Sequence, residues 1–224
     1  MDRLTPSSPR VQAMPVKECD EPLVDIALAS GLQFGPPPEC PETAPHYRFV
    51  RRSILERLQH AQSLLPDGIC LRLYEGYRSL QVQQLLFDQE YARIKRRQPE
   101  LSDAQAYRET TRLVSAVQRP DGSLNIPPHA TGAAVDVELV DANGQVLDFG
   151  MEIADWSRVD PGLCVTDAGG LSASARYHRQ MLQDVMERAG FVNYVEEWWH
   201  FSYGDQLWAY VTGNPVAIYG VIDL

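Results

Sequence analysis

The sequence predicts an α+β fold, a single domain in which helices flank a central antiparallel sheet. The chain has 224 residues, and 44% of them are hydrophobic, which suffices for one sizeable core. Apolar residues recur at helical spacing in some segments and alternate with polar residues in others. The turn-forming segment 141–144 joins two alternating segments, which predicts an antiparallel hairpin.

The first 45 residues are predicted to form an extended arm rather than long helices. Prolines occur at positions 36–38 and again at Pro41 and Pro45. Proline lacks a backbone N–H donor and interrupts helices. We therefore expect residues 1–45 to wrap around the body or to fray in part, and residues 46–224 to form the functional domain.

Helices are predicted where apolar residues repeat every three to four positions. The expected helices cover residues 46–65, 79–97, 102–118 and 173–189. Ser102 and Gln105 have the spacing of a capping box, which marks the start of the third helix. Gly190 follows the fourth helix and is a favoured residue just past a helix end.

Strands are predicted where apolar and polar residues alternate. The expected strands cover residues 69–74, 134–140 and 145–149, and a strand or strand pair is expected over residues 191–203. Residues 150–172 show no clear period and contain Pro-Gly and Gly-Gly pairs. A loop of this length is often functional, so we expect it to lie over a site as a lid.

Charge and composition exclude several classes of partner. The net charge of −10 repels a nucleic-acid backbone, so DNA and RNA are not expected partners. No segment reads as a signal peptide or as a membrane span, so we expect a cytoplasmic protein without a membrane partner. Cys19, Cys40, Cys70 and Cys164 are widely spaced, and we interpret them as ordinary thiols. The pattern does not indicate an oligomeric state.

Two short segments, some sixty residues apart, carry the chemistry. The first contains His129 and Asp136, and the second contains Glu197 and His200. Two imidazoles and one carboxylate form the ligand set of a catalytic zinc ion that keeps one position open for water. We therefore predict one zinc ion per chain, held by His129, Asp136 and His200.

Each of these residues also has an ordinary interpretation. Asp136 shares strand parity with Glu138 and could lie with it on a solvent-exposed face, and His129 could be a simple loop histidine. A carboxylate in so apolar a strand is expected to be partly buried, however, and a buried charge needs a cation or strong donors. The combination of residues favours a metal site.

The metal hypothesis sets two conditions on the backbone. Gly132 must bend the chain sharply, because a regular strand would direct His129 and Asp136 to opposite faces. Glu197 and His200 differ in strand parity, so Glu197 must lie at an irregular strand start or on a bulge. A regular strand there would contradict the hypothesis.

The predicted roles follow from zinc chemistry. The ion lowers the pKa of a bound water to roughly 7, which supplies hydroxide at neutral pH. Glu197 is then the candidate general base, which would pass the proton to the leaving amine. Arg78 is the candidate for stabilising the developing oxyanion, although a surface salt bridge at a helix start is an equal alternative for it.

These segments resemble the motifs of a known family. Its first motif reads S-x-H-x-x-G-x-A-x-D and its second reads E-x-W-H. The chain matches them at His129, Gly132, Ala134, Asp136, Glu197, Trp199 and His200. Residues 75–79 also resemble the arginine-bearing turn of that family. The chain is therefore similar, over at least residues 75–205, to the D-alanyl-D-alanine dipeptidases of the vancomycin-resistance type, within the zinc D-Ala-D-Ala peptidases.

The resemblance implies a fold, a cofactor and a substrate. The fold would be α+β with a central antiparallel sheet, similar to the hedgehog-type domain, and residues 46–224 would be the zinc dipeptidase catalytic domain. Zn²⁺ would be the cofactor, with Glu197 as base and Arg78 as transition-state stabiliser. The substrate would be D-alanyl-D-alanine or a similar small dipeptide.

The chain departs from the family pattern at two places. Pro127 replaces the motif serine, which removes a hydroxyl group and a backbone donor from the substrate wall. The family also uses a carboxylate after the hairpin to hold the substrate ammonium, and the spacing here leaves both Glu152 and Asp155 as candidates. Such a carboxylate would make the enzyme a dipeptidase, because a longer peptide would leave it buried and unpaired.

Two other interpretations compete with a dipeptidase. One is a cell-wall D,D-carboxypeptidase or endopeptidase of the same superfamily, which would need export and an open groove. The other is a non-hydrolytic use of the triad, either in an iron oxygenase or in a non-catalytic metal-binding module. The presence of both Glu197 and Arg78 argues against a module that has lost catalysis.

Overall fold

The computed structural model describes residues 4–29, 31–38 and 41–222, and it confirms the α+β fold class. A five-stranded sheet has the order β2-β4-β5-β7-β6, and β1 and β3 form a second, two-stranded sheet. The strands are β1 (Leu23–Asp25), β2 (Gln33–Phe34), β3 (Phe49–Arg51), β4 (Ile69–Glu75), β5 (Ala134–Asp141), β6 (Val192–Asn193) and β7 (His200–Ser202). The central sheet is antiparallel as predicted, except that β2 pairs with β4 in parallel.

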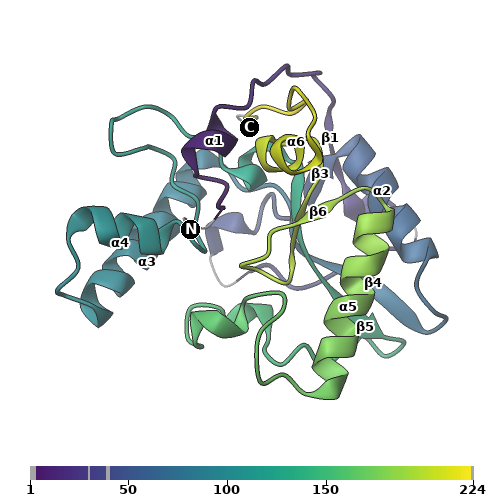
Figure 1. Cartoon of the computed structure of the whole chain (residues 1–224). Coiled ribbons are helices and arrows are strands. Elements are labelled where there is room, and N and C mark those ends of the chain that lie inside the picture. Colours follow the sequence, from purple (N-terminus) through teal and green to yellow (C-terminus); the bar gives the residue numbers. More distant parts are fainter. Residues whose placement is uncertain (1–3, 30, 39–40, 223–224) are drawn as a thin grey trace.

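Helices lie on both sides of this sheet. The α-helices are α1 (Pro9–Gln12), α2 (Arg52–Ser63), α3 (Leu80–Arg97), α4 (Asp103–Thr110), α5 (Ala173–Arg188) and α6 (Gln206–Thr212). The short 3₁₀ helices are η1 (Ile26–Leu28), η2 (Pro41–Thr43), η3 (Pro128–Thr131), η4 (Ile153–Asp155) and η5 (Pro161–Leu163). Figure 1 shows α2 and α5 side by side along β4 and β5, with α3 and α4 on the opposite side of the molecule. Within the described residues, no helix is both long and apolar enough to cross a bilayer.

The main core fills the space between the sheet and the α2–α5 pair. Leu71 of β4 and Val137 of β5 point into it and meet Ile54 of α2 and Leu182 of α5. All four side chains are almost fully buried. The alternation of the strand residues and the helical spacing of the others therefore produce one apolar layer, as the two periods predict.

Several predicted helix ends are confirmed. The helices expected over residues 79–97 and 173–189 are α3 and α5. Ser79 caps α3 through its hydroxyl oxygen, and Ser102 forms the predicted capping box with Gln105 at the start of α4.

Two predicted helices have different limits. The segment expected to be helical from residue 46 contains β3, which pairs antiparallel with β1, so α2 begins at Arg52. The helix expected to reach residue 118 ends at Thr110, whose hydroxyl donates a hydrogen bond to the Ala106 carbonyl. Both differences arise from contacts that helical periodicity does not encode.

The strand predictions were right for β4 and β5 and for a strand pair within residues 191–203, and wrong for residues 145–149. No strand forms over residues 145–149, where Val146 makes a single isolated bridge to Val140. Residues 191–203 form β6 and β7 with an irregular turn between them. Helix α6 was not predicted, because it is short and carries no long apolar repeat.

The proline-rich arm is mainly extended and lies against the body. Helix α1 packs on α6 through Val11 and Leu207 (Figure 1). Val16 bridges Ala217, so the arm runs beside the C-terminal segment. Among the cysteines that the structure describes, none forms a disulfide, and Cys40 lies outside the described residues.

Candidate metal centre

The candidate metal ligands meet on the face of the central sheet opposite the main core. Asp136 of β5 lies directly opposite His200 of β7 in the antiparallel register, so their side chains point to the same face. His129 is in η3, immediately before β5. All three residues are buried.

Gly132 makes the bend on which this convergence depends. It ends η3 in the left-handed conformation, with φ +68°. A Cβ atom at this position would collide with the Leu23 side chain. Glycine is therefore required here both by the backbone conformation and by the close packing of the arm, and the predicted sharp turn between His129 and Asp136 is confirmed.

The ligand atoms form a nearly regular triangle. His129 Nε2 lies 3.2 Å from His200 Nδ1 and 3.4 Å from Asp136 Oδ1. His200 Nδ1 lies 3.1 Å from the same carboxylate oxygen. Tetrahedral ligands at zinc bond lengths are separated by about 3.3 Å, because each bond is about 2.0–2.1 Å long. The donor set can therefore hold one metal ion of this size.

A buried contact fixes the orientation of His129. Its Nδ1 atom lies 2.7 Å from the carbonyl oxygen of Gly76, which can only accept a hydrogen bond. Nδ1 therefore carries the proton and Nε2 presents its lone pair to the cluster. An outer contact of this kind is usual for a metal-binding histidine.

The charges in the cluster favour a cation. Burial acts to raise the pKa of Asp136, but His129 and His200 outweigh it and hold this pKa below its ordinary value. Burial lowers the pKa of His200, which favours the neutral, ligand form of the ring. Burial raises the pKa of Glu197 well above its ordinary value, and the nearby Asp136 carboxylate adds to this.

Glu197 lies beside the cluster rather than within it. Its Oε2 atom is 3.6 Å from His200 Nδ1. The backbone N–H of Glu197 donates to the Tyr194 carbonyl in the turn between β6 and β7. Glu197 precedes β7, so the alternation of side chains along that strand does not fix its direction. The irregular strand start that the metal hypothesis required is therefore confirmed.

Arg78 is largely but not fully buried, and it is held by two side chains that sequence reasoning missed. Its Nε atom donates to Glu75, Nη2 makes a second, short contact with that carboxylate, and Nη1 donates to Gln83 at 3.0 Å. Burial acts to lower the pKa of Arg78, but Glu75 outweighs it and raises this pKa. An ion pair with Glu75 is present at the helix start, as in the alternative interpretation, but it is not a surface pair, because the side chains of Arg78 and Glu75 are only 12% and 4% exposed.

Glu75 reaches this position through a β-bulge. The pairing of β4 with β5 shifts between Leu73 and Glu75, so that Glu75 lies opposite Asp136. Without the bulge, Glu75 would share the parity of Leu73 and point into the core. The carboxylate within residues 75–79 was visible in the sequence, but nothing in the local pattern indicated the bulge.

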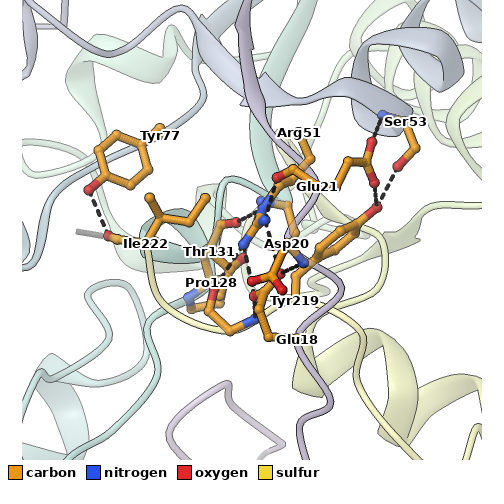
Figure 2. A network of polar contacts seen from close by, with 12 residues as sticks. Glu18, Asp20, Glu21, Arg51, Ser53, Tyr77, Pro128, Thr131, Tyr219 and Ile222 are labelled. Atoms are coloured by element: carbon orange, nitrogen blue, oxygen red, sulfur yellow. Dashed lines mark hydrogen bonds and ion pairs between the residues drawn. The ribbon is translucent and has the colours of Figure 1, made fainter. Parts of the chain in front are cut away.

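A second polar network holds the His129 segment to both ends of the chain (Figure 2). Arg51 is buried and donates from Nε to the Thr131 carbonyl at 2.8 Å, while its terminal nitrogens bind the Glu18 carboxylate of the arm. The backbone N–H of Ile222 donates to the Ala130 carbonyl. The arm and the C-terminal segment therefore both position η3.

A cavity of about 350 Å³ opens onto the cluster. Its wall includes residues from the arm and the long loop, as well as from the sheet and α3. Side chains that line it include Pro6, Thr43, Tyr74, Arg78, Arg112, Ile153, Trp156, Glu197 and Trp199. The arm therefore takes part in the cavity wall.

The two candidate carboxylates for the substrate ammonium lie beside this cavity. Neither carboxylate is among the lining residues, and Glu152 is exposed. Asp155 is half-buried and pairs with Arg158 at 3.3 Å. Its neighbours Ala154 and Trp156 line the cavity, so η4 borders the site, and the choice between the two carboxylates stays a prediction.

The fold and the site together define a class of protein, an α+β enzyme with a two-histidine, one-carboxylate centre beside a buried glutamate. Residues 50–216 match the D-ala-D-ala dipeptidase family, and the chain belongs to this family. The protein is therefore a peptidase.

The chain is similar to several individual proteins. A D-alanyl-D-alanine dipeptidase from Synechocystis sp. is 32% identical over 244 residues, covering 98% of this chain and 98% of that protein. A D-alanyl-D-alanine dipeptidase from Escherichia coli is 30% identical over 74 residues, or 33% of this chain and 36% of that protein. The solved structure of the vancomycin resistance D,D-pentapeptidase VanY with Zn(II) is 19% identical, with 89% of both chains covered and a TM-score of 0.43.

Proposed function

We propose that this peptidase is a zinc-dependent dipeptidase that hydrolyses D-alanyl-D-alanine or a similar small dipeptide. The observation that carries the proposal is the triangle of ligand atoms from His129, Asp136 and His200, with Glu197 beside it. Family membership and a relative of nearly equal length support the substrate class. The cavity volume is near the lower end of the range for small-molecule sites, as a dipeptide requires.

The donor set suits a zinc ion. His129 Nε2, His200 Nδ1 and an oxygen of Asp136 would hold the ion, and their separations fit tetrahedral coordination. When bound, zinc lowers the pKa of a coordinated water to about 7 and polarises a carbonyl group. The same ligand types occur in iron oxygenases, so metal analysis of the purified protein is the direct test between the two.

Glu197 is assigned the proton transfers. Its carboxylate would accept a proton from the attacking water and then give it to the amine nitrogen as the peptide bond breaks. Burial and the neighbouring Asp136 raise the pKa of Glu197, which makes its carboxylate a stronger base for the first transfer and lets it hold the proton until the second. Proton transfer of this kind contributes about 10²- to 10⁴-fold to a rate.

Arg78 is assigned the stabilisation of the oxyanion. A guanidinium group has five N–H donors, and the contacts with Glu75 and Gln83 use three of them. Nη1 and Nη2 each retain one further N–H, so the fork can present two parallel donors to an oxygen that gains negative charge. Glu75 and Gln83 fix this fork in place before the substrate binds.

Recognition of the ammonium group would make the enzyme a dipeptidase. We propose Asp155 for this role, because it is half-buried and lies between two cavity-lining residues, whereas Glu152 is exposed. Asp155→Asn should raise KM for a free dipeptide and leave cleavage of an N-blocked peptide unchanged. Glu152→Gln is the matched control, and an equal effect of the control would reject the assignment.

One substrate panel tests the proposed function. The zinc-loaded protein is incubated with D,D-, L,D- and L,L-dialanine and with N-acetyl-D-alanyl-D-alanine, and the release of free amine is measured. We expect cleavage of the free D,D-dipeptide and little cleavage of the blocked one. Preferential cleavage of the blocked peptide would instead favour a D,D-carboxypeptidase.

A further inference from the structure

The two imidazoles of the candidate metal centre differ in their outer contacts. The non-ligand nitrogen of His129 is paired with the Gly76 carbonyl. His200 directs Nδ1 toward the cluster, and its Nε2 atom is buried without a hydrogen-bond partner in the described part of the chain. A metal-binding histidine normally donates its second N–H to a carboxylate, a carbonyl or a water molecule. An acceptor for the N–H of His200 Nε2 is therefore expected nearby.

Asp205 offers the complementary acceptor. It follows β7 and caps α6, and it is 2% exposed. Its Oδ1 atom accepts hydrogen bonds from the Ser202 hydroxyl at 2.9 Å and from the Trp208 backbone N–H at 2.7 Å. Its Oδ2 atom is buried and, within the described residues, also has no partner. An unpaired buried carboxylate oxygen is costly, so a donor is expected for it.

Strand β7 places the His200 imidazole and the Asp205 carboxylate on the same face of the sheet. His200 and Ser202 are two residues apart on β7, so their side chains point to the same face of the sheet. The Ser202 hydroxyl holds Asp205, which brings the carboxylate to the face that carries the imidazole. Burial lowers the pKa of His200, and Asp205 is one of the carboxylates that act against this shift.

We propose that Asp205 is the outer positioning residue of the metal centre. Its Oδ2 atom accepts a hydrogen bond from one bridging water molecule, which in turn accepts from His200 Nε2–H, because the two side chains are not in direct contact. This contact holds the proton on Nε2 and keeps the Nδ1 lone pair directed at the metal. The inference rests on the proposed function, because it assumes that His200 is a metal ligand.

The neighbouring Gln206 does not replace Asp205 in this role. Its Oε1 atom is likewise buried without a partner among the described residues, but its Nε2 atom is tied to the Gln12 and Met14 carbonyls of the arm. A carboxylate is a stronger acceptor than an amide oxygen. The bridging water molecule can accept one hydrogen bond from His200 Nε2–H and donate one each to Asp205 Oδ2 and Gln206 Oε1.

The test replaces one atom of the carboxylate. Asp205→Asn retains an oxygen that can accept from Ser202 and Trp208, but it puts an NH₂ group in place of Oδ2. The NH₂ group and His200 Nε2–H then both donate toward the bridging water molecule, so we expect zinc affinity to fall about 10- to 100-fold, measured by competition with a chelator. The visible spectrum of the cobalt-substituted protein should change as well. Asp160→Asn is the control, because Asp160 also caps a short helix with its carboxylate but is exposed.

A measurement on the unmodified protein covers the case in which the variant fails to fold. In the zinc-loaded protein, nitrogen-15 NMR should show His200 with its proton on Nε2 and with slow exchange of that proton. A folded Asp205→Asn variant with zinc affinity within twofold of the unmodified protein would overturn the inference, as would a rapidly exchanging Nε2 proton. Failure of the unmodified protein to bind zinc would instead reject the proposed function.

Discussion

The two faces of the central sheet use the same strands for different purposes. On the α2–α5 face, Leu71 and Val137 pack into an apolar core. On the other face, Arg72, Asp136 and Glu138 are charged, and both carboxylates are buried. Successive residues of one strand point to opposite faces, so adjacent positions contribute either to the apolar core or to the charged site.

The charged face contains two buried carboxylates with different partners: Glu138 is paired with an arginine, which we call the closed set, and Asp136 contacts two imidazoles, which we call the open set. Glu138 accepts two hydrogen bonds from Arg72, at 2.9 and 2.7 Å, and this pair is complete. Asp136 meets two imidazoles that converge on the same point without a permanent cation among them. Buried charge is tolerated when it is paired, so the open set is the place where an added cation is most favourable. The comparison therefore favours this cluster as the candidate metal site.

The largest expected effect comes from removing a ligand on the charged face. His200→Ala should abolish both zinc binding and peptidase activity, because two remaining ligands cannot hold the ion in place. Metal content per chain measured by mass spectrometry checks this. His60→Ala, on the exposed side of α2, is the control and should retain zinc. Unchanged metal content in His200→Ala would reject the ligand assignment.

The next effect separates catalysis from binding within the same cluster. Glu197→Gln should retain zinc but lower kcat by about 10²- to 10⁴-fold, because the proton acceptor is lost. Steady-state kinetics together with metal analysis checks this prediction, with the exposed Glu187→Gln of α5 as control. A variant that keeps normal turnover would remove Glu197 from the mechanism.

Arg78→Ala should have a somewhat smaller effect. The loss of oxyanion stabilisation should lower kcat by about 10²- to 10³-fold and change KM much less. Comparison of kcat and KM for the dipeptide provides the measurement. A change mainly in KM would make Arg78 a residue that binds the ground state of the substrate.

The smallest effect on activity is expected on the apolar face. Leu139→Ala should leave kcat nearly unchanged at a temperature where the protein is folded, and it should lower the free energy of unfolding by about 2–5 kcal/mol. Denaturant unfolding of the metal-free protein measures the second quantity. If this variant lost kcat while retaining its stability, the separation of the two faces would be contradicted.

The sequence was most informative where the determinants are local. The convergence of His129, Asp136 and His200 could be predicted because the chemistry of the donors and the bend at Gly132 both appear within short segments. The capping box of Ser102 and Gln105 was predicted for the same reason. These features need no knowledge of the distant chain.

The features that were missed depend on pairing between distant segments. Strand β3 exists because it pairs with β1 of the arm, and the helix period gave no sign of it. Glu75 faces Arg78 only because a bulge shifts the register of β4 against β5. The proposed link between Asp205 and His200 depends on two buried atoms without partners among the described residues, Asp205 Oδ2 and His200 Nε2, which only the folded chain brings to one face of the sheet. A single sequence does not encode such relations in a readable pattern.

The most direct test of the metal centre is X-ray diffraction from crystals of the zinc-loaded protein, with data collected on both sides of the zinc absorption edge. The account predicts one anomalous peak per chain, bonded to His129 Nε2, His200 Nδ1 and an Asp136 oxygen, with the Glu197 carboxylate beside it. A peak elsewhere, or no peak between these three residues in protein that retains activity, would contradict it.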